Sequence, residues 1–242
     1  MKRLENKIAL ITGGGSGIGR GIALAIAQEG ANIVVCGRRK QKLDETISLV
    51  RELNVEGLAI QADISIDLDV QRVVQQTLNH FGQIDILINN AGVFMGKQVH
   101  QTEPDDWDKV MAINLRGVFL LTRRVLPYMR ERRSGHIINI GSESGLDYYD
   151  GDGVYGTSKH ALNAFNEYVQ RENQDFNIRV NAICPGMVVT EMTENDQGLI
   201  HDRCLYPEDI ADLVIWLVTR RQNIKIGTPI LIQTMLNPWE NG

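Results

Sequence analysis

Two residues with complementary acid–base chemistry, Tyr155 and Lys159, stand four positions apart in the sequence Tyr-Gly-Thr-Ser-Lys. In a helix this spacing places both side chains on one face. A free phenol titrates near pH ~10 and transfers protons poorly at neutral pH, but a nearby ammonium group favours the phenolate and lowers the phenol pKa. The pair could therefore move a proton, and Ser142 adds a hydroxyl thirteen residues before Tyr155. Exposed helix faces also carry this spacing by chance, so its meaning depends on the surrounding sequence.

A glycine-rich segment, Thr-Gly-Gly-Gly-Ser-Gly-Ile-Gly at residues 12–19, follows the first apolar run and precedes an apolar helical pattern. Glycines let the backbone turn sharply and approach a ligand, and a helix N-terminus attracts anions. The spacing Gly-x-x-x-Gly-x-Gly differs from Gly-x-Gly-x-x-Gly, and the Gly-Lys-Ser/Thr of a Walker loop does not follow. We expect the segment to bind a pyrophosphate, with a tight turn that binds no ligand as the alternative.

The second apolar run ends in Cys-Gly-Arg-Arg at residues 36–39. In dinucleotide-binding domains an acidic residue near this point binds the ribose 2′-hydroxyl of NAD, whereas an arginine accommodates the 2′-phosphate of NADP. Gly37 stands where the carboxylate would be, and the guanidinium groups of Arg38 and Arg39 pair well with a phosphate. The segment favours NADP(H), with NAD(H) as a second possibility. The alternative is that both arginines only begin the next helix in solvent.

Short β-branched runs alternate along the chain with longer amphipathic stretches. Because several of the short runs are continuously apolar, they are typical of parallel strands covered on both faces. The alternation predicts an α/β fold with a doubly wound parallel sheet, a Rossmann-type three-layer sandwich of seven strands. Without a linker or repeat, residues 1–242 are best interpreted as one domain. The predicted strands are 8–12, 32–36, 58–62, 85–89, 136–142, 179–184 and 230–233, and the predicted helices are 18–29, 40–53, 68–81, 107–130, 154–172 and 207–219.

Composition excludes several other classes of protein. A net charge of −5 argues against a nucleic-acid partner. No apolar stretch approaches the length of a membrane span, and the five histidines lack metal-ligand spacing, so we expect neither a membrane partner nor a metal. The three cysteines, Cys36, Cys184 and Cys204, form no Cys-x-x-Cys pair. They are interpreted as reduced packing residues in a cytoplasmic protein.

The order and spacing of these motifs resemble those of the short-chain dehydrogenases/reductases, in the branch with a single Rossmann-type domain. The resemblance extends from about residue 7 to residue 233. The matching motifs are the glycine-rich segment 12–19, Asn-Asn-Ala-Gly at 89–92, Asn114, Ser142, Tyr155 with Lys159, and Pro185-Gly186. Each motif alone is weak, but their joint order makes coincidence improbable.

The resemblance implies a role for each residue of the acid–base group. Ser142 would hydrogen-bond the substrate oxygen, with nearby Ser144 as a competing candidate. Tyr155 would donate a proton to a carbonyl or remove one from an alcohol. Lys159 would bind the nicotinamide ribose and lower the tyrosine pKa. Asn114 would hold a water that links Lys159 to solvent, unless its side chain only bonds back within its own helix.

The resemblance also implies a set of cofactor contacts at the carboxyl ends of the strands. Asp63 would contact the adenine amino group, and Thr190 would bind the nicotinamide carboxamide. The full expected set is Gly13, Ser16, Gly17, Ile18, Gly19, Arg38, Arg39, Asp63, Ile64, Asn90, Ala91, Gly92, Tyr155, Lys159, Pro185, Gly186, Val188 and Thr190.

Two segments are expected to border the substrate, the loop between Ser142 and Tyr155 and a lid at about residues 187–206. Both carry more carboxylates than basic groups, which disfavours an anionic substrate. The chain end at 231–239 also lacks the Asp-Gly-Gly segment of many relatives.

We therefore interpret the chain as an NADP(H)-dependent oxidoreductase that transfers hydride between nicotinamide and a small-molecule carbonyl or secondary alcohol. A 3-oxoacyl-[acyl-carrier-protein] reductase is the alternative among enzymes. A dinucleotide-binding regulatory protein is the alternative outside enzymes. The resemblance further implies a homodimer or homotetramer formed through the helices around 107–130 and 154–172.

Overall fold

The computed structural model describes residues 2–194 and 196–239. Its centre is one sheet of seven parallel strands in the order β3-β2-β1-β4-β5-β6-β7, which confirms the expected doubly wound Rossmann-type fold. The strand order reverses between β1 and β4, and this point is where open α/β sheets bind ligands. The strands are β1 Ile8–Thr12, β2 Asn32–Gly37, β3 Gly57–Gln61, β4 Ile86–Asn89, β5 Gly135–Ile140, β6 Ile178–Pro185 and β7 Ile230–Ile232.

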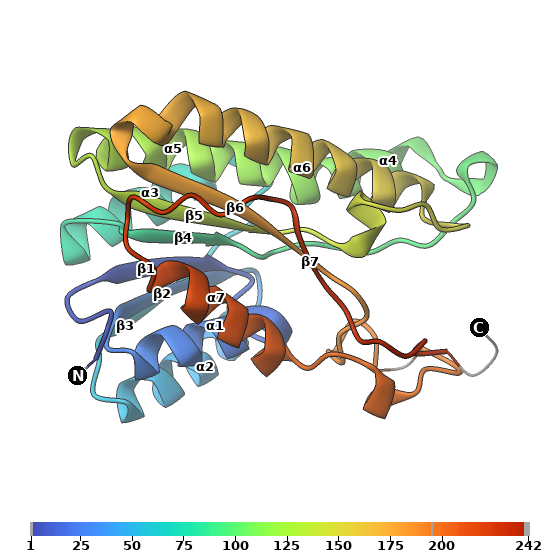
Figure 1. Cartoon of the computed structure of the whole chain (residues 1–242), viewed down its shortest axis with the longest axis horizontal. Coiled ribbons are helices and arrows are strands. Elements are labelled where there is room, and N and C mark those ends of the chain that lie inside the picture. Colours follow the sequence, from blue (N-terminus) through green and yellow to red (C-terminus); the bar gives the residue numbers. More distant parts are fainter. Residues whose placement is uncertain (1, 195, 240–242) are drawn as a thin grey trace.

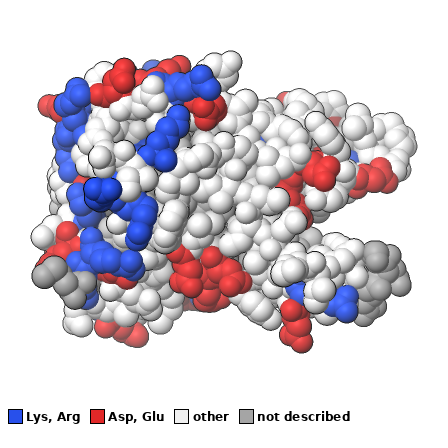
Figure 2. All heavy atoms as spheres, in the orientation of Figure 1, with Lys and Arg blue, Asp and Glu red and all other residues white. Residues whose placement is uncertain are grey.

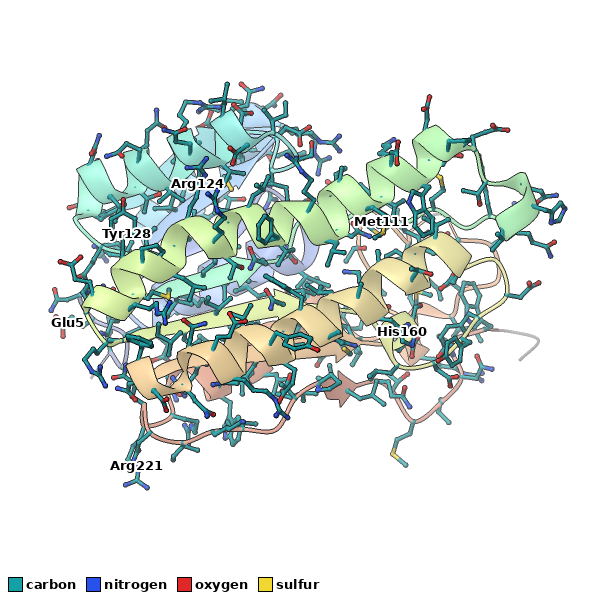
Figure 3. The ribbon with its side chains drawn as sticks, turned by 90° about the horizontal axis from the view of Figure 1, so that it is seen from above. Glu5, Met111, Arg124, Tyr128, His160 and Arg221 are labelled. Carbon is teal, nitrogen blue, oxygen red and sulfur yellow. The ribbon has the colours of Figure 1, made fainter. Side chains whose placement is uncertain are left out.

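Helices cover both faces of this sheet (Figure 1). One layer contains α1, α2 and α7, and the other contains α3, α4, α5 and α6 (Figure 1). Figure 3 shows α5 and α6 side by side across the outside of the second layer. The α-helices are α1 Gly17–Gln28, α2 Lys40–Glu52, α3 Asp67–Phe81, α4 Pro104–Met111, α5 Gly117–Glu131, α6 Gly153–Asn173 and α7 Pro207–Val218.

The sheet separates two hydrophobic cores, because successive strand residues point to opposite faces. In β1, Ile11 belongs to the core under α1, α2 and α7, whereas Leu10 belongs to the core under α3 and α5. All five residues of β1 are buried. This burial on both faces explains why the central strands appear in the sequence as continuous apolar runs.

The largest difference from the predicted elements lies at residues 107–130, where one long helix was expected. The chain instead forms α4, a π-helical turn at Ala112–Arg116, and α5. At the start of α5, a Cβ on Gly117 would lie 2.8 Å from Ile64 Cδ1, so the helix passes very close to the segment after β3. Strand β5 also ends at Ile140 rather than at Ser142, which leaves the serine in the loop beyond the strand.

A chain of asparagine side chains crosses the buried part of the second layer. Asn89 Nδ2 donates to Asn139 Oδ1 at 2.8 Å, and Asn139 Nδ2 donates to Asn166 Oδ1 at 2.9 Å. The three residues come from β4, β5 and α6 and are at most 2% exposed. This chain of hydrogen-bonded asparagines therefore fixes α6 against β4 and β5, the two strands that lead to the site.

Helices long and apolar enough to span a membrane are absent from the described part of the chain. Within residues 2–194 and 196–239, no three His, Cys, Asp or Glu side chains are grouped as metal ligands. The three cysteines are free thiols in buried positions.

The asparagine chain predicts a specific loss of stability. Replacing Asn139 by alanine leaves the buried Asn166 Oδ1 without this donor and weakens the pairing of Asn89, so we expect the free energy of unfolding to fall by about 3 kcal/mol. Urea unfolding followed by circular dichroism measures this loss. Asn79→Ala is the control, because Asn79 is an exposed residue of α3, and it should change stability by less than about 0.5 kcal/mol. Equal stability of the two variants would contradict this role.

Candidate active site

The glycine-rich segment connects the end of β1 to the start of α1 at the reversal of strand order. Gly17 has φ = +50°, and a Cβ there would lie 3.2 Å from Thr190 Cγ2. A Cβ on Gly19 would lie 2.4 Å from the carbonyl oxygen of Gly13, which no side chain can tolerate. The backbone therefore reaches the N-terminus of α1 in a form that only glycine allows. This bare N-terminus fits a pyrophosphate group.

Thr12 holds the glycine-rich segment against β4. Its Oγ1 accepts hydrogen bonds from the main-chain N–H groups of Asn90 and Ala91, each at 2.9 Å. Asn90 Nδ2 in return donates to the carbonyl of Thr12 at 2.9 Å. Thr12 was not among the predicted site residues. A hydroxyl at the last position of the strand, directly before the glycines, was the available signal.

The two arginines at the end of β2 have different surroundings. Arg38 lines a cavity of about 570 Å³ together with Asp63 and Arg72. Arg39 instead donates from Nη2 to Ser16 Oγ and to Glu191 Oε2, both at 2.7 Å. Only the first arginine therefore borders the open cavity without an ion pair among the described residues.

The segment after β3 places Asp63 at the rim of the cavity and Ile64 in the hydrophobic core. Asp63 Oδ1 accepts from the N–H and the hydroxyl of Ser65, at 2.9 and 2.7 Å, which fixes the carboxylate at the rim of the cavity. Ile64 is buried, and its side chain lies in the second core against Gly117. Any contact of Ile64 with the cofactor would therefore be made by its backbone atoms.

Tyr155 and Lys159 occupy the first turns of α6 and lie on the same side, as their spacing predicts. Lys159 Nζ is 5.5 Å from the centre of the Tyr155 ring and donates to the carbonyl of Ile140 at 2.9 Å. Ser142 follows that carbonyl by two residues, and a hydrogen-bonding interaction with its hydroxyl lowers the pKa of the Tyr155 phenol. The end of β5 thus brings all three predicted side chains together.

The pKa values of Tyr155 and Lys159 differ from our expectation that Lys159 would lower the phenol pKa. Burial raises the pKa of Tyr155 to about 12, and the Ser142 interaction offsets this only in part. Burial also lowers the pKa of Lys159 to about 8. Removal from water penalises charge and shifts both groups toward their neutral forms, but with a pKa of about 8 Lys159 remains mainly an ammonium group at neutral pH. Without a bound ligand, Tyr155 is a protonated phenol at neutral pH.

Asn114 lies in the π-helical turn behind Lys159 and is 1% exposed. Its Oδ1 accepts from the N–H of Val93, and its Nδ2 donates to the carbonyl of the same residue, both at 2.9 Å. Nδ2 also donates to Ser158 Oγ at 3.1 Å. The side chain therefore joins the segment after β4 to α6 and does not bond back within its own helix.

Gly92 completes this wall beside the lysine. A Cβ on Gly92 would lie 3.8 Å from Lys159 Nζ and 3.4 Å from Asn114 Oδ1. The ring of Phe94 contacts that of Tyr155 edge to face, with centroids 5.1 Å apart. Phe94 was not predicted as a site residue, because a single aromatic residue in a loop carries no distinctive spacing.

The segment after β6 forms the opposite wall. Pro185 ends the strand, and the N–H of Gly186 donates to the carbonyl of Ile232 in β7 at 2.8 Å. Val188 is buried and pairs with Leu205 across the base of the predicted lid. The N–H of Thr190 donates to Thr193 Oγ1 at 3.0 Å, which shapes the turn at the start of the lid. Residue 195 of the predicted lid lies outside the described residues.

The model of the family described as short chain dehydrogenase matches residues 7–198. The chain belongs to this family.

Two curated relatives match this short-chain dehydrogenase along almost its whole length. An uncharacterized oxidoreductase of Staphylococcus epidermidis is 33% identical over 228 residues, covering 94% of this chain and 97% of the relative. A 3-oxoacyl-[acyl-carrier-protein] reductase of Thermotoga maritima is 35% identical over 242 residues, covering 94% and 96%. Among solved structures, the alcohol dehydrogenase of the archaeon Thermococcus sibiricus, complexed with 5-hydroxy-NADP, has a TM-score of 0.87 at 25% identity and covers 95% of this chain and 97% of that one.

Membership makes this chain an oxidoreductase that acts on CH–OH or C=O groups with a nicotinamide dinucleotide. The observed glycines and the free N-terminus of α1 fit the pyrophosphate of such a cofactor, and the cavity beside Arg38 fits its adenosine end. The acid–base group then lies at the opposite end of the same edge of the sheet.

The dehydrogenase has an acidic wall beside Tyr155. A Cβ on Gly186 would lie 3.1 Å from Glu143 Oε2, so this carboxylate lies against the segment after β6. Burial, together with the charges of Asp147 and Asp152, raises the pKa of Glu143. Figure 2 shows a notch between two lobes at this end of the molecule, with acidic side chains on the upper lobe.

Ser144, the alternative to Ser142 as the serine that binds the substrate oxygen, is part of this acidic wall. Its hydroxyl donates to Asp152 Oδ2 at 2.7 Å, and the residue is buried. Ser142 Oγ accepts only the N–H of Ser144, at 3.1 Å, among the hydrogen bonds of the described residues. Its hydroxyl also interacts with the Tyr155 phenol and lowers the pKa of that group, so the two hydroxyls lie together.

The lowered pKa of Lys159 predicts a pH-dependent stability of the dehydrogenase. Between pH ~7 and pH ~10 the unfolded chain binds more protons at this lysine than the folded one, so its cost to folding decreases by about 2 kcal/mol as pH rises. We expect the free energy of unfolding of the wild type to increase by this amount relative to Lys159→Met, which lacks the titrating group. Urea unfolding of both proteins at several pH values measures the difference. A constant difference would show that Lys159 stays charged in the folded protein.

Proposed function

We propose that this protein is an NADP(H)-dependent oxidoreductase that interconverts an uncharged carbonyl compound and its secondary alcohol. The observation that carries the proposal is the meeting of Tyr155, Lys159 and Ser142 at the end of β5, beside the reversal of strand order. A regulatory protein needs a phosphate loop but has no use for a proton donor paired with a buried ammonium group. The arrangement therefore favours turnover over binding alone.

The nicotinamide cofactor supplies or accepts the hydride, and the residues of this chain supply orientation and the proton. Ser142 and Tyr155 together hydrogen-bond the substrate oxygen and stabilise the negative charge that develops there. Lys159 holds the nicotinamide ribose with its ammonium group, whose other partner is the Ile140 carbonyl. Asn114 fixes the segment after β4 against α6, so the lysine keeps its position.

The protonation of Tyr155 suits carbonyl reduction. With a pKa of about 12, the phenol is protonated at neutral pH and can donate its hydrogen to the substrate oxygen. The oxidation of an alcohol instead needs a proton acceptor, and the positive charges of Lys159 and of an oxidised nicotinamide would lower the phenol pKa for that direction. Because reduction produces the same phenolate that oxidation requires, these positive charges assist both directions.

Arg38 supports NADP(H) as the preferred cofactor. It is exposed and lines the cavity at the end of β2, where the 2′-phosphate of the adenosine ribose would lie. Lys40 and Arg72 line the same cavity but are paired with Asp44 and Asp69, so Arg38 is the cavity arginine left to bind a phosphate among the described residues. Gly37 presents no carboxylate that could bind a 2′-hydroxyl.

Reduction of a 3-oxoacyl group on an acyl carrier protein is the second candidate, because the Thermotoga maritima relative is named for it. Two features disfavour it in this chain. Glu143 lies within the electrostatic influence of Asp147 and Asp152, and this acidic wall would repel an anionic substrate. In addition, Arg130 Cζ lies 4.0 Å from the centre of the Phe176 ring. This basic side chain near the end of α5 is therefore engaged by a residue of this protein and is less available to an acidic carrier protein.

The pairing of α5 and α6 supports a homodimer, or a homotetramer built from such dimers. A cavity of about 360 Å³ between these helices is lined by Phe119, Leu126 and Phe165. Tyr128 and Tyr168 are also exposed on the two helices, at 40% and 68%. A second copy would cover this apolar surface, because α5 and α6 lie on the outside of the molecule (Figure 3). The free cysteines further support a cytoplasmic location, and the one continuous sheet supports a single domain.

Replacing Tyr155 by phenylalanine tests the proposed reaction. Because the proton donor is lost, we expect carbonyl-dependent NADPH oxidation to fall about 10²–10⁴-fold, while NADPH binding followed by fluorescence is retained. The substrate panel includes neutral ketones, diketones and a 3-oxoacyl thioester. Tyr168→Phe, an exposed residue of the same helix, is the control and should keep full activity. Equal rates for Tyr155→Phe and wild type would support the regulatory alternative.

Replacing Arg38 by alanine tests the cofactor preference. The loss of a charged hydrogen-bond donor to the 2′-phosphate should raise the KM for NADPH about 10-fold or more and leave the KM for NADH nearly unchanged. Steady-state kinetics with both cofactors measures the two effects. Arg221→Ala is the control, because Arg221 is exposed at the far end of the molecule (Figure 3). A similar change for both cofactors would contradict the preference for NADP(H).

A further inference from the structure

Arg39 connects two segments that lie far apart in the sequence. Its Nη2 donates to Ser16 Oγ in the phosphate loop and to Glu191 Oε2 in the lid, both at 2.7 Å. The side chains of Arg39 and Glu191 are 58% and 43% exposed, so solvent and ligands can reach the pair. The guanidinium group is thus bound by a carboxylate, one residue away from the arginine that borders the phosphate cavity.

The neighbouring contacts keep Glu191 at this position. Thr190, the preceding residue, approaches Gly17 so closely that a Cβ on the glycine would lie 3.2 Å from Thr190 Cγ2. The Arg39 guanidinium lowers the pKa of Glu191 more than burial raises it, and the Ser16 hydroxyl lowers it further. The carboxylate is therefore ionised at neutral pH and lies beside the phosphate loop.

We propose that Glu191 is a determinant of cofactor specificity that competes with the 2′-phosphate of NADP(H) for Arg39. The inference rests on the proposed cofactor chemistry and assigns different roles to the two arginines. Arg38 borders the open cavity and is free to bind the phosphate, whereas Arg39 binds it only when Glu191 gives way. Glu191 thereby reduces the advantage of NADP(H) over NAD(H) that two free arginines would give.

The size of the effect follows from the exposure of the pair. Exposed ion pairs are weak because water screens both charges. Removing the carboxylate frees the Arg39 guanidinium group to bind the phosphate. We therefore expect a gain in affinity of about 3- to 5-fold for a ligand with a 2′-phosphate, and no gain for a ligand without one.

Isothermal titration calorimetry with two fragments tests the inference without turnover. Adenosine 2′,5′-bisphosphate carries the 2′-phosphate, and AMP is the matched probe that lacks it. We expect Glu191→Gln to bind the bisphosphate about 3- to 5-fold more tightly than wild type and to bind AMP equally well. The gain should disappear when Glu191→Gln is combined with Arg39→Ala. Glu194→Gln, an exposed acid of the same segment that is not paired with Arg39, is the matched control and should bind both probes as wild type does.

Three results would overturn the inference. Weaker binding of the bisphosphate by Glu191→Gln would mean that the carboxylate orients Arg39 for the phosphate. An equal change for both probes would mean that the lid acts on the whole nucleotide. A gain that persists in the Arg39→Ala background would mean that the gain in affinity does not come from freeing Arg39. None of these results depends on catalysis, so a failure of the Tyr155 proposal leaves the binding comparison intact.

Discussion

The hydrogen bond from Lys159 to the carbonyl of Ile140 joins the first turns of α6 to the end of β5. An ammonium group in this buried position loses most of its hydration, and its lowered pKa reflects that cost. The surrounding structure is arranged to keep it there. Asn114 fixes α6 to the segment after β4, and the buried asparagine chain fixes the same helix to β4 and β5. The lysine therefore has its geometry before any ligand binds.

The contact between β1 and β4 sets the second half of the site. Thr12 accepts the N–H groups that follow β4, so the glycine-rich loop and the wall at Gly92 move as one unit. The lid belongs to a different unit, because it follows β6 and reaches the loop through Thr190 and the pair between Arg39 and Glu191. Rigid strand ends thus position the chemistry, while side chains at the surface of the lid adjust what the site accepts.

The sheet and its seven strands could be predicted because burial on both faces leaves continuous apolar runs in the sequence. The acid–base group could be predicted because Tyr155 and Lys159 are close in the chain. The π-helical turn at Ala112–Arg116 could not, since it depends on how the helix packs, including the close approach of Gly117 to Ile64. The raised pKa of Tyr155 depends on its burial, which spacing does not reveal. The pairing of Arg39 with Glu191 joins residues 152 positions apart, and only the fold brings them together.

The buried thiols have a practical consequence for measuring motion in this molecule. Burial raises the pKa of Cys36, Cys184 and Cys204, so the reactive thiolate form is disfavoured at all three positions. A maleimide dye would therefore react far faster with a new, exposed cysteine than with the native ones. One engineered thiol on the predicted lid and one on α2 would give a clean pair of fluorophores for single-molecule distance measurements.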